Sequence, residues 1–212
     1  MKSQFATWPI GTGVIFAVAV AATAWPLASA ALVGDREAMR AGEIWRAWTA
    51  HGVHFSWSHL GWSSLLWLVA GGMMERESRR AWLASVWLVA PLVTGAALWL
   101  DPQSARYGGL SGMACVPLVW LGLGWALRGE GIKRLTGVGV LCAVVAKVAW
   151  EFCGGAGLPF LADFDPAFGE VRAAPWAHVA GALGGVLVFW ASGGDKKHNK
   201  NPAKKIIIRA HS

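Results

Sequence analysis

The sequence predicts an all-α fold, a polytopic membrane bundle of six transmembrane helices. Hydrophobic residues make up 55% of the 212 residues and charged residues only 15%, whereas soluble domains carry about 25% charged residues. The 27 Gly and 15 Trp residues suit close helix packing and aromatic anchoring at a membrane surface. Six apolar stretches approach the length of about 20 residues that crosses a bilayer. They lack the alternating pattern of a membrane β-barrel, so helices are expected.

The six predicted segments are 11–32, 59–74, 81–100, 110–127, 135–153 and 176–192. The first follows Lys2 and contains Ala28-Ser29-Ala30, so it also resembles a signal peptide with its cleavage site; its length favours retention as a helix. Long outer loops are expected between the first two segments and between the last two. We predict one six-helix membrane domain over residues 1–195 and a basic cytoplasmic tail over 196–212.

The positive charges predict an orientation. Most of the 19 Lys and Arg residues lie on the same side as the N-terminus, and the positive-inside rule then places both termini in the cytoplasm of a bacterial inner membrane. This distribution explains the net charge of +7 without nucleic acid as a partner, because the tail can lie on anionic lipid headgroups. The three cysteines have no metal-type spacing, so no metal or other cofactor is expected.

Four polar residues on four different segments have the same predicted depth. Each lies 17 residues from a charged residue at the cytoplasmic end of its segment, which is about 25 Å of helix. The four are Ser111, His178, Glu151 and His59. Polar groups within a membrane are costly to bury and therefore mark a functional site. A common site a few ångströms below the outer surface is expected.

The residues at this depth suit acyl transfer. Ser111 is the candidate nucleophile and His178 the candidate general base that takes its proton. His59 and Ser63 lie one turn apart on one helix face and are candidate donors to an oxyanion. The glycines Gly109 and Gly112 would let a backbone approach the serine closely. We expect no acidic third member.

Four motifs in the right order resemble the rhomboid intramembrane serine proteases. They are Gly109-Leu110-Ser111-Gly112, the last-helix motif of His178 with Gly181 and Gly185, His54-x4-His59-x3-Ser63, and Trp45-Arg46 in the first outer loop. The resemblance covers roughly residues 40–190. It implies a serine–histidine pair that cleaves membrane-anchored protein substrates in the lipid bilayer, glycines that pack the last helix on the serine helix, and an outer loop ordered by Trp45, Arg46 and His54.

Two residues depart from the family pattern, and others indicate a branch. Ser63 stands where the family usually has Asn, and Cys115 where it often has Tyr. Tyr107, the short core and the pair Lys147-x3-Glu151 resemble the rhombosortase branch. That resemblance implies substrates with a C-terminal Gly-Gly, transmembrane and basic-tail sorting signal. Lys147 and Glu151 form either a structural ion pair or a substrate site.

Alternatives remain open at this point. The chain could be a rhomboid protease of other specificity, a catalytically inactive rhomboid-like protein that binds clients, or a small transporter, although transporter repeats are not found. Ser111 could be a helix cap, His178 and His59 interfacial anchors, and Ser63 a residue bonded to its own helix.

Overall fold

The protein is a bundle of helices with one short strand pair. The computed structural model describes residues 8–154 and 174–193. Its elements are α1 (Ile10–Ala24), α2 (Pro26–Leu32), β1 (Gly34–Asp35), α3 (Arg36–Arg40), α4 (Arg46–Thr49), η1 (Ala50–Gly52), α5 (Trp57–Leu66), η2 (Trp67–Gly71), α6 (Gly72–Glu77), α7 (Arg79–Ala84), η3 (Ser85–Val89), α8 (Ala90–Trp99), β2 (Arg106–Tyr107), α9 (Ser111–Arg128), α10 (Gly131–Phe152) and α11 (Pro175–Ala191). Lys2, most of the second predicted outer loop and the tail 196–212 lie outside these residues.

Several helical stretches are apolar enough to cross a membrane. By length and composition these are Arg79–Trp99, Ser111–Arg128 and Gly131–Phe152, with a fourth if the bent pair α1 and α2 counts as one span. Helix α11 is apolar but shorter. The chain is thus a multi-pass, all-α membrane protein, and the total of six spans stays a prediction.

The first predicted segment is not one straight helix. Helices α1 and α2 meet at an angle of 117°, with Trp25 between them in an extended conformation. Pro26 explains the break, because the residue before a proline is disfavoured in the helical region and proline cannot donate to the preceding turn. Ser29 of the Ala28-Ser29-Ala30 motif is buried, and its hydroxyl donates to the Ala22 carbonyl at 2.6 Å.

A buried carboxylate fastens the start of α1. Glu75 of α6 accepts hydrogen bonds from the Gly11 N–H at 3.0 Å, the Thr12 N–H at 2.8 Å and the Thr12 hydroxyl at 2.8 Å. The first N–H groups of a helix have no partner within the helix, and its N-terminus favours negative charge. Glu75 therefore joins α1 to the α5–α6 helix.

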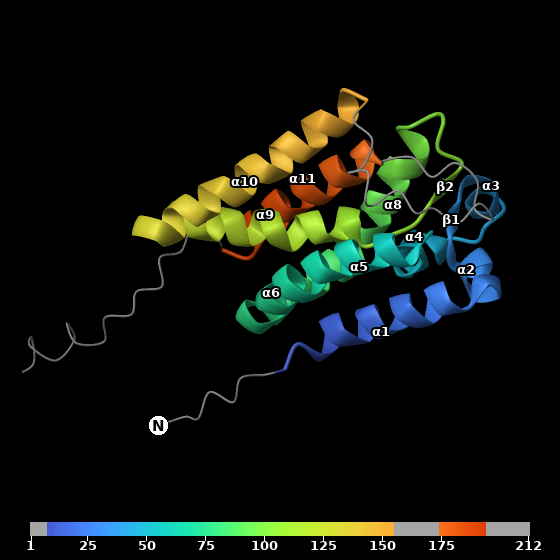
Figure 1. Ribbon diagram of the computed structural model, residues 1–212, viewed down its shortest axis with the longest axis horizontal. Helices are drawn as coiled ribbons and strands as arrows, with labels where there is room; N and C mark the ends of the chain where they lie inside the picture. The colour runs from blue at the N-terminus through green and yellow to red at the C-terminus, as the bar shows by residue number, and fades with distance from the viewer. Residues whose placement is uncertain (1–7, 155–173, 194–212) are drawn as a thin grey trace, which may run out of the picture.

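Helix α9 lies at the centre of the bundle. It packs against α10 and α11 on one side and against α5, η2 and α6 on the other (Figure 1). The largest fully buried side chains include Trp67 of η2, Leu98 of α8 and Phe189 of α11. Two stretches of π-helix, η2 and η3, interrupt the α-helices on either side of the α6–α7 turn.

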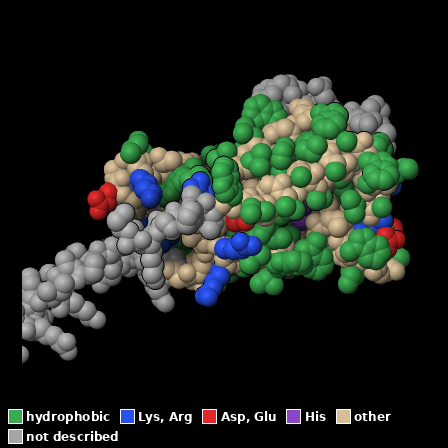
Figure 2. All heavy atoms as spheres, turned by 90° about the horizontal axis from the view of Figure 1, so that it is seen from below, with side chains coloured by type: hydrophobic (Ala, Val, Ile, Leu, Met, Phe, Trp, Pro, Cys, Tyr) green, Lys and Arg blue, Asp and Glu red, His purple; other side chains and the backbone are tan. Residues whose placement is uncertain are grey.

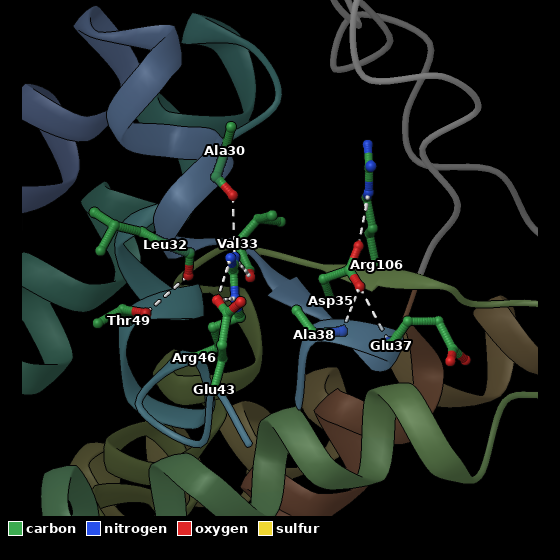
Figure 3. A network of polar contacts seen from close by, with 10 residues as sticks. All are labelled: Ala30, Leu32, Val33, Asp35, Glu37, Ala38, Glu43, Arg46, Thr49 and Arg106. Atoms are coloured by element: carbon green, nitrogen blue, oxygen red, sulfur yellow. Dashed lines mark hydrogen bonds and ion pairs between the residues drawn. The ribbon is translucent and has the colours of Figure 1, made fainter. Parts of the chain in front are cut away.

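At one end of the bundle, the pairing of β1 with β2 and the contact of Asp35 with Arg106 form a group that we call the polar clasp. Strands β1 and β2 pair antiparallel, with Asp35 opposite Arg106. Asp35 also caps α3 by accepting the backbone N–H groups of Glu37 and Ala38 (Figure 3). The polar clasp joins the segment after α2 to the segment that leads into α9.

The surface is largely apolar between charged ends. Figure 2 shows hydrophobic side chains over much of one face, with Lys and Arg side chains gathered toward the end where α6 finishes and α10 begins. Many Trp, Leu and Val side chains are exposed, among them Trp87, Leu88 and Val145. In water such a surface would associate, and it instead suits contact with lipid.

Candidate active site

The loop before α9 determines where Ser111 lies. Gly109 has a φ of +123°, a left-handed conformation that favours glycine. A Cβ at this position would also lie 2.8 Å from two ring atoms of His59. The next residue, Leu110, donates its N–H to Nε2 of His54 at 3.2 Å. The chain therefore turns sharply and places Ser111 at the first position of α9.

Two buried histidines order this loop. Burial lowers the pKa of His54 to about 3, so its ring is neutral at physiological pH and Nε2 can accept the Leu110 N–H. His51 lies with Nδ1 3.3 Å from the Gly109 carbonyl oxygen and Nε2 3.0 Å from the Ala90 carbonyl oxygen. Both rings thus hold backbone groups around the serine loop.

Ser111 and His178 are within hydrogen-bond distance. The Ser111 Oγ lies 3.0 Å from Nε2 of His178, although 67 residues separate them in the chain. His178 is on the first turn of α11 and is only 4% exposed. The close approach of α9 and α11 depends on glycine, because a Cβ at Gly181 would overlap the Gly112 carbonyl oxygen. A Cβ at Gly185 would likewise lie 2.6 Å from a carbonyl oxygen of α9.

His178 has an acidic partner that the sequence analysis did not expect. Nδ1 of His178 lies 2.7 Å from Oε2 of Glu151 on α10. The other carboxylate oxygen accepts a hydrogen bond from Nζ of Lys147 at 2.5 Å. Lys147 and Glu151 therefore form an ion pair, and Glu151 also contacts the histidine. Equal depth of Glu151 and His178 was the only signal for this contact in the sequence.

His59 lies beside the serine loop. Its ring occupies the space next to Gly109, and its Nδ1 is buried with no hydrogen-bond partner in the part of the chain that the structure describes. Among the residues that the structure describes, no side chain caps the start of α9, so the first N–H groups of that helix are available near Ser111. These groups and the His59 ring are the candidate oxyanion donors.

Ser63 is bonded within its own helix, which is the alternative that the sequence left open for this residue. Its hydroxyl is buried and donates to the His59 carbonyl one turn earlier, at 2.6 Å. The hydroxyl hydrogen is thus used within its own helix, which is common for serine in helices.

Trp45 and Arg46 are neighbours in the chain, but Arg46 is buried and Trp45 is exposed. Arg46 donates Nη1 to the Ala30 and Val33 carbonyls at 3.0 and 2.8 Å and contacts Glu43 at 2.6 Å (Figure 3). Trp45 is 51% exposed. Arg46 therefore fixes the loop, while Trp45 presents its ring at the surface. Within residues 8–154 and 174–193, no group of three His, Cys, Asp or Glu side chains suits a metal ion.

Comparison with known proteins identifies the family. Residues 41–194 match the family model described as Rhomboid domain. No curated protein matches the chain. The matched range contains Ser111, His178, Glu151 and His59. Because the match covers more than half of the chain, the protein belongs to the rhomboid family, whose members are generally serine peptidases that act on membrane-embedded substrates within the bilayer.

Proposed function

We propose that the protein is an intramembrane serine endopeptidase in which Ser111 is the nucleophile and His178 the general base. The observation that carries this proposal is the 3.0 Å contact between Ser111 Oγ and His178 Nε2. A serine hydroxyl is a weak nucleophile until an adjacent base takes its proton. A protein that only binds membrane clients has no need of this contact.

The reaction divides into acylation and deacylation. Ser111 Oγ forms a bond to the scissile carbonyl carbon while its proton passes to Nε2 of His178. The oxyanion accepts hydrogen bonds from the N–H of Ser111 and from the His59 ring. His178 then gives the proton to the leaving amine, and a second nucleophile, water in the simplest case, releases the acyl group by the same steps in reverse.

We propose that the protein belongs to the rhombosortase branch and cleaves the class of substrates which that branch cleaves. The support is the short core, Tyr107 before the serine motif and the Lys147–Glu151 pair, all of which resemble that branch. Its substrates carry a C-terminal Gly-Gly, a transmembrane segment and a basic tail. A rhomboid protease of other specificity is the alternative.

We also propose a bacterial inner-membrane location with both termini in the cytoplasm. The charge distribution supports it, because the positively charged residues gather on one side. This orientation places Ser111 near the outer face, where water reaches a shallow site and where exported substrates arrive.

A fluorophosphonate probe tests the chemistry. We expect the purified protein in detergent to be labelled covalently, and Ser111→Ala to abolish the label while the helical content stays unchanged. The matched control is Ser64→Ala, a buried serine of α5 outside the site, which should leave labelling intact. Labelling that persists in Ser111→Ala would contradict the proposal.

A substrate pair tests the specificity. A fusion bearing the Gly-Gly sorting signal should be cleaved in proteoliposomes, and the same fusion with Val-Val in place of Gly-Gly should not. Cleavage of both at equal rates would leave the protein as a rhomboid protease outside the rhombosortase branch.

A further inference from the structure

We infer that Glu151 is a positioning residue that holds His178 in the tautomer required of a base, so that the site works as a Ser111–His178–Glu151 triad. The inference rests on the proposed serine peptidase function. It assigns Glu151 to the chemistry rather than to recognition of the substrate.

The two ring nitrogens of His178 are engaged on opposite sides. Nε2 faces Ser111 Oγ at 3.0 Å, and Nδ1 faces Oε2 of Glu151 at 2.7 Å. An ionised carboxylate can only accept hydrogen bonds. The hydrogen of a neutral His178 must then sit on Nδ1, which leaves the lone pair of Nε2 directed at the serine hydroxyl.

Lys147 does not select the tautomer. Its Nζ lies 3.2 Å from Nδ1 and 3.3 Å from Nε2 of His178. A point that is nearly equidistant from both nitrogens lies over the face of the ring and not along either lone pair. The Ser111 hydroxyl can either donate to Nε2 or accept from it, whereas the carboxylate can only accept. Among the contacts of His178 with described side chains, Glu151 is therefore the one that determines which nitrogen carries the hydrogen.

Lys147 instead supports the carboxylate. The Glu151 side chain is 10% exposed and the Lys147 side chain 43% exposed. Burying a lone carboxylate is costly unless a partner and hydrogen bonds offset the loss of water. Lys147 supplies the partner at Oε1 and keeps its own charge near the surface, so Oε2 stays free for His178.

The negative charge of Glu151 also stabilises the positive charge that develops on the His178 ring during the reaction. As Ser111 Oγ bonds to the scissile carbon, its proton moves to Nε2 and the ring becomes a cation. Glu151 accepts the Nδ1–H throughout and remains unprotonated, which stabilises this cation. The proton later leaves Nε2 for the departing amine, and the ring returns to its neutral form.

Kinetics of matched variants test the inference. Glu151→Gln keeps the shape but not the charge, and either amide end can face Nδ1. We expect kcat to fall about 100- to 10,000-fold on both the Gly-Gly substrate and a generic rhomboid substrate, with KM nearly unchanged. Glu151→Asp, which keeps the charge, should recover part of the loss. The control is Glu130→Gln, the same change at the exposed opposite end of α10, and it should leave kcat unchanged.

Nitrogen NMR of labelled histidine gives a readout that a purely structural role would not move. We expect the neutral His178 of the wild type to carry its hydrogen on Nδ1, and Glu151→Gln to show a mixture of the two tautomers. The inference is overturned if cleavage requires Ser111 but Glu151→Gln keeps kcat within about threefold or keeps the wild-type tautomer. Loss of thermal stability with an unchanged kcat would also overturn it. If wild-type cleavage does not require Ser111, the proposed function fails first, which is a separate result.

Discussion

In the proposed mechanism Ser111 and His178 act on the same step, so the effects of their substitutions are expected not to add. Ser111→Ala and His178→Ala should each remove nearly all cleavage while the protein still inserts and folds. The double variant should be scarcely slower than either single one, because each change already disables the same step. Turnover of a membrane substrate in proteoliposomes measures this. Substantial activity in Ser111→Ala would contradict the mechanism.

The two candidate oxyanion donors should differ in effect. His59→Ala should lower kcat about 100- to 1000-fold, the usual loss for one donor. Ser63→Ala should lower it much less, because the Ser63 hydroxyl already donates to the His59 carbonyl. Single-turnover kinetics of both variants test the difference. Equal losses would show that Ser63 leaves its helix carbonyl during the reaction.

At the residue scale, the sequence located the pair but not its partner. The separation of Ser111 and His178 from the charged helix ends predicted a common depth, and the motifs predicted the contact, which the structure has at 3.0 Å. The contact of Glu151 with His178 depends on how α10 is rotated about its axis. Lys147 and Glu151 lie one turn apart and mark one polar face of α10, but the sequence does not say which neighbouring side chain this face contacts.

At the scale of elements, the glycine contact between α9 and α11 determines the site. Gly181→Ala should be destabilising by about 1–3 kcal/mol, the usual range for overpacking, and should separate Ser111 from His178. Gly139→Ala is the matched control, because a Cβ there meets nothing within 4 Å and alanine favours a helix. Thermal unfolding in detergent and turnover measure both effects. Equal Tm values for the two variants would contradict tight packing at Gly181.

The stability that the polar clasp contributes to the fold should depend on pH. The backbone N–H of Ala38, with Arg106 nearby, holds the pKa of Asp35 below its usual value of 3.8. A carboxyl whose pKa is lowered by folding stabilises the fold above its unfolded value, and this stabilisation is lost as pH falls through the folded value. Asp35→Ala should therefore lower the free energy of unfolding at neutral pH by about 0.5–2 kcal/mol, the usual loss for a helix cap. The variant's Tm should fall accordingly. The difference from wild type should shrink below pH 3.8. A constant difference down to acid pH would exclude this role.

The apolar stretches of the sequence predict most of the helices. The bend in the first helix and the short strand pair were not predicted. Five of the six predicted segments coincide with a continuous helical stretch within a few residues. The bend in the first comes from Pro26, a signal that was present but outweighed by the apolar run around it. The two-residue pairing of β1 with β2 joins segments far apart in the chain, and no repeated pattern in so short a strand predicts its partner.

At the scale of the whole molecule, the charge distribution predicts the topology. Reporter fusions after Arg80 and after Arg134 should report a cytoplasmic location, and a fusion at Glu43 should report a periplasmic one. Positive residues resist translocation, which is the physical basis of the expectation. Alkaline phosphatase and fluorescent-protein fusions at the same sites give opposite signals and serve as mutual controls. The reverse pattern would place Ser111 near the inner face.

The π-helical stretch η2 has a consequence for how one helix serves two partners. An α-helix turns by about 100° per residue, so the extra residue of a π turn shifts the angular phase of everything beyond it. Before η2, the helix directs His59 toward the serine loop; after it, the same helix directs Glu75 toward the start of α1. Deleting one residue from Trp67–Gly71 would restore a regular helix, but one of these two side chains would then point away from its partner.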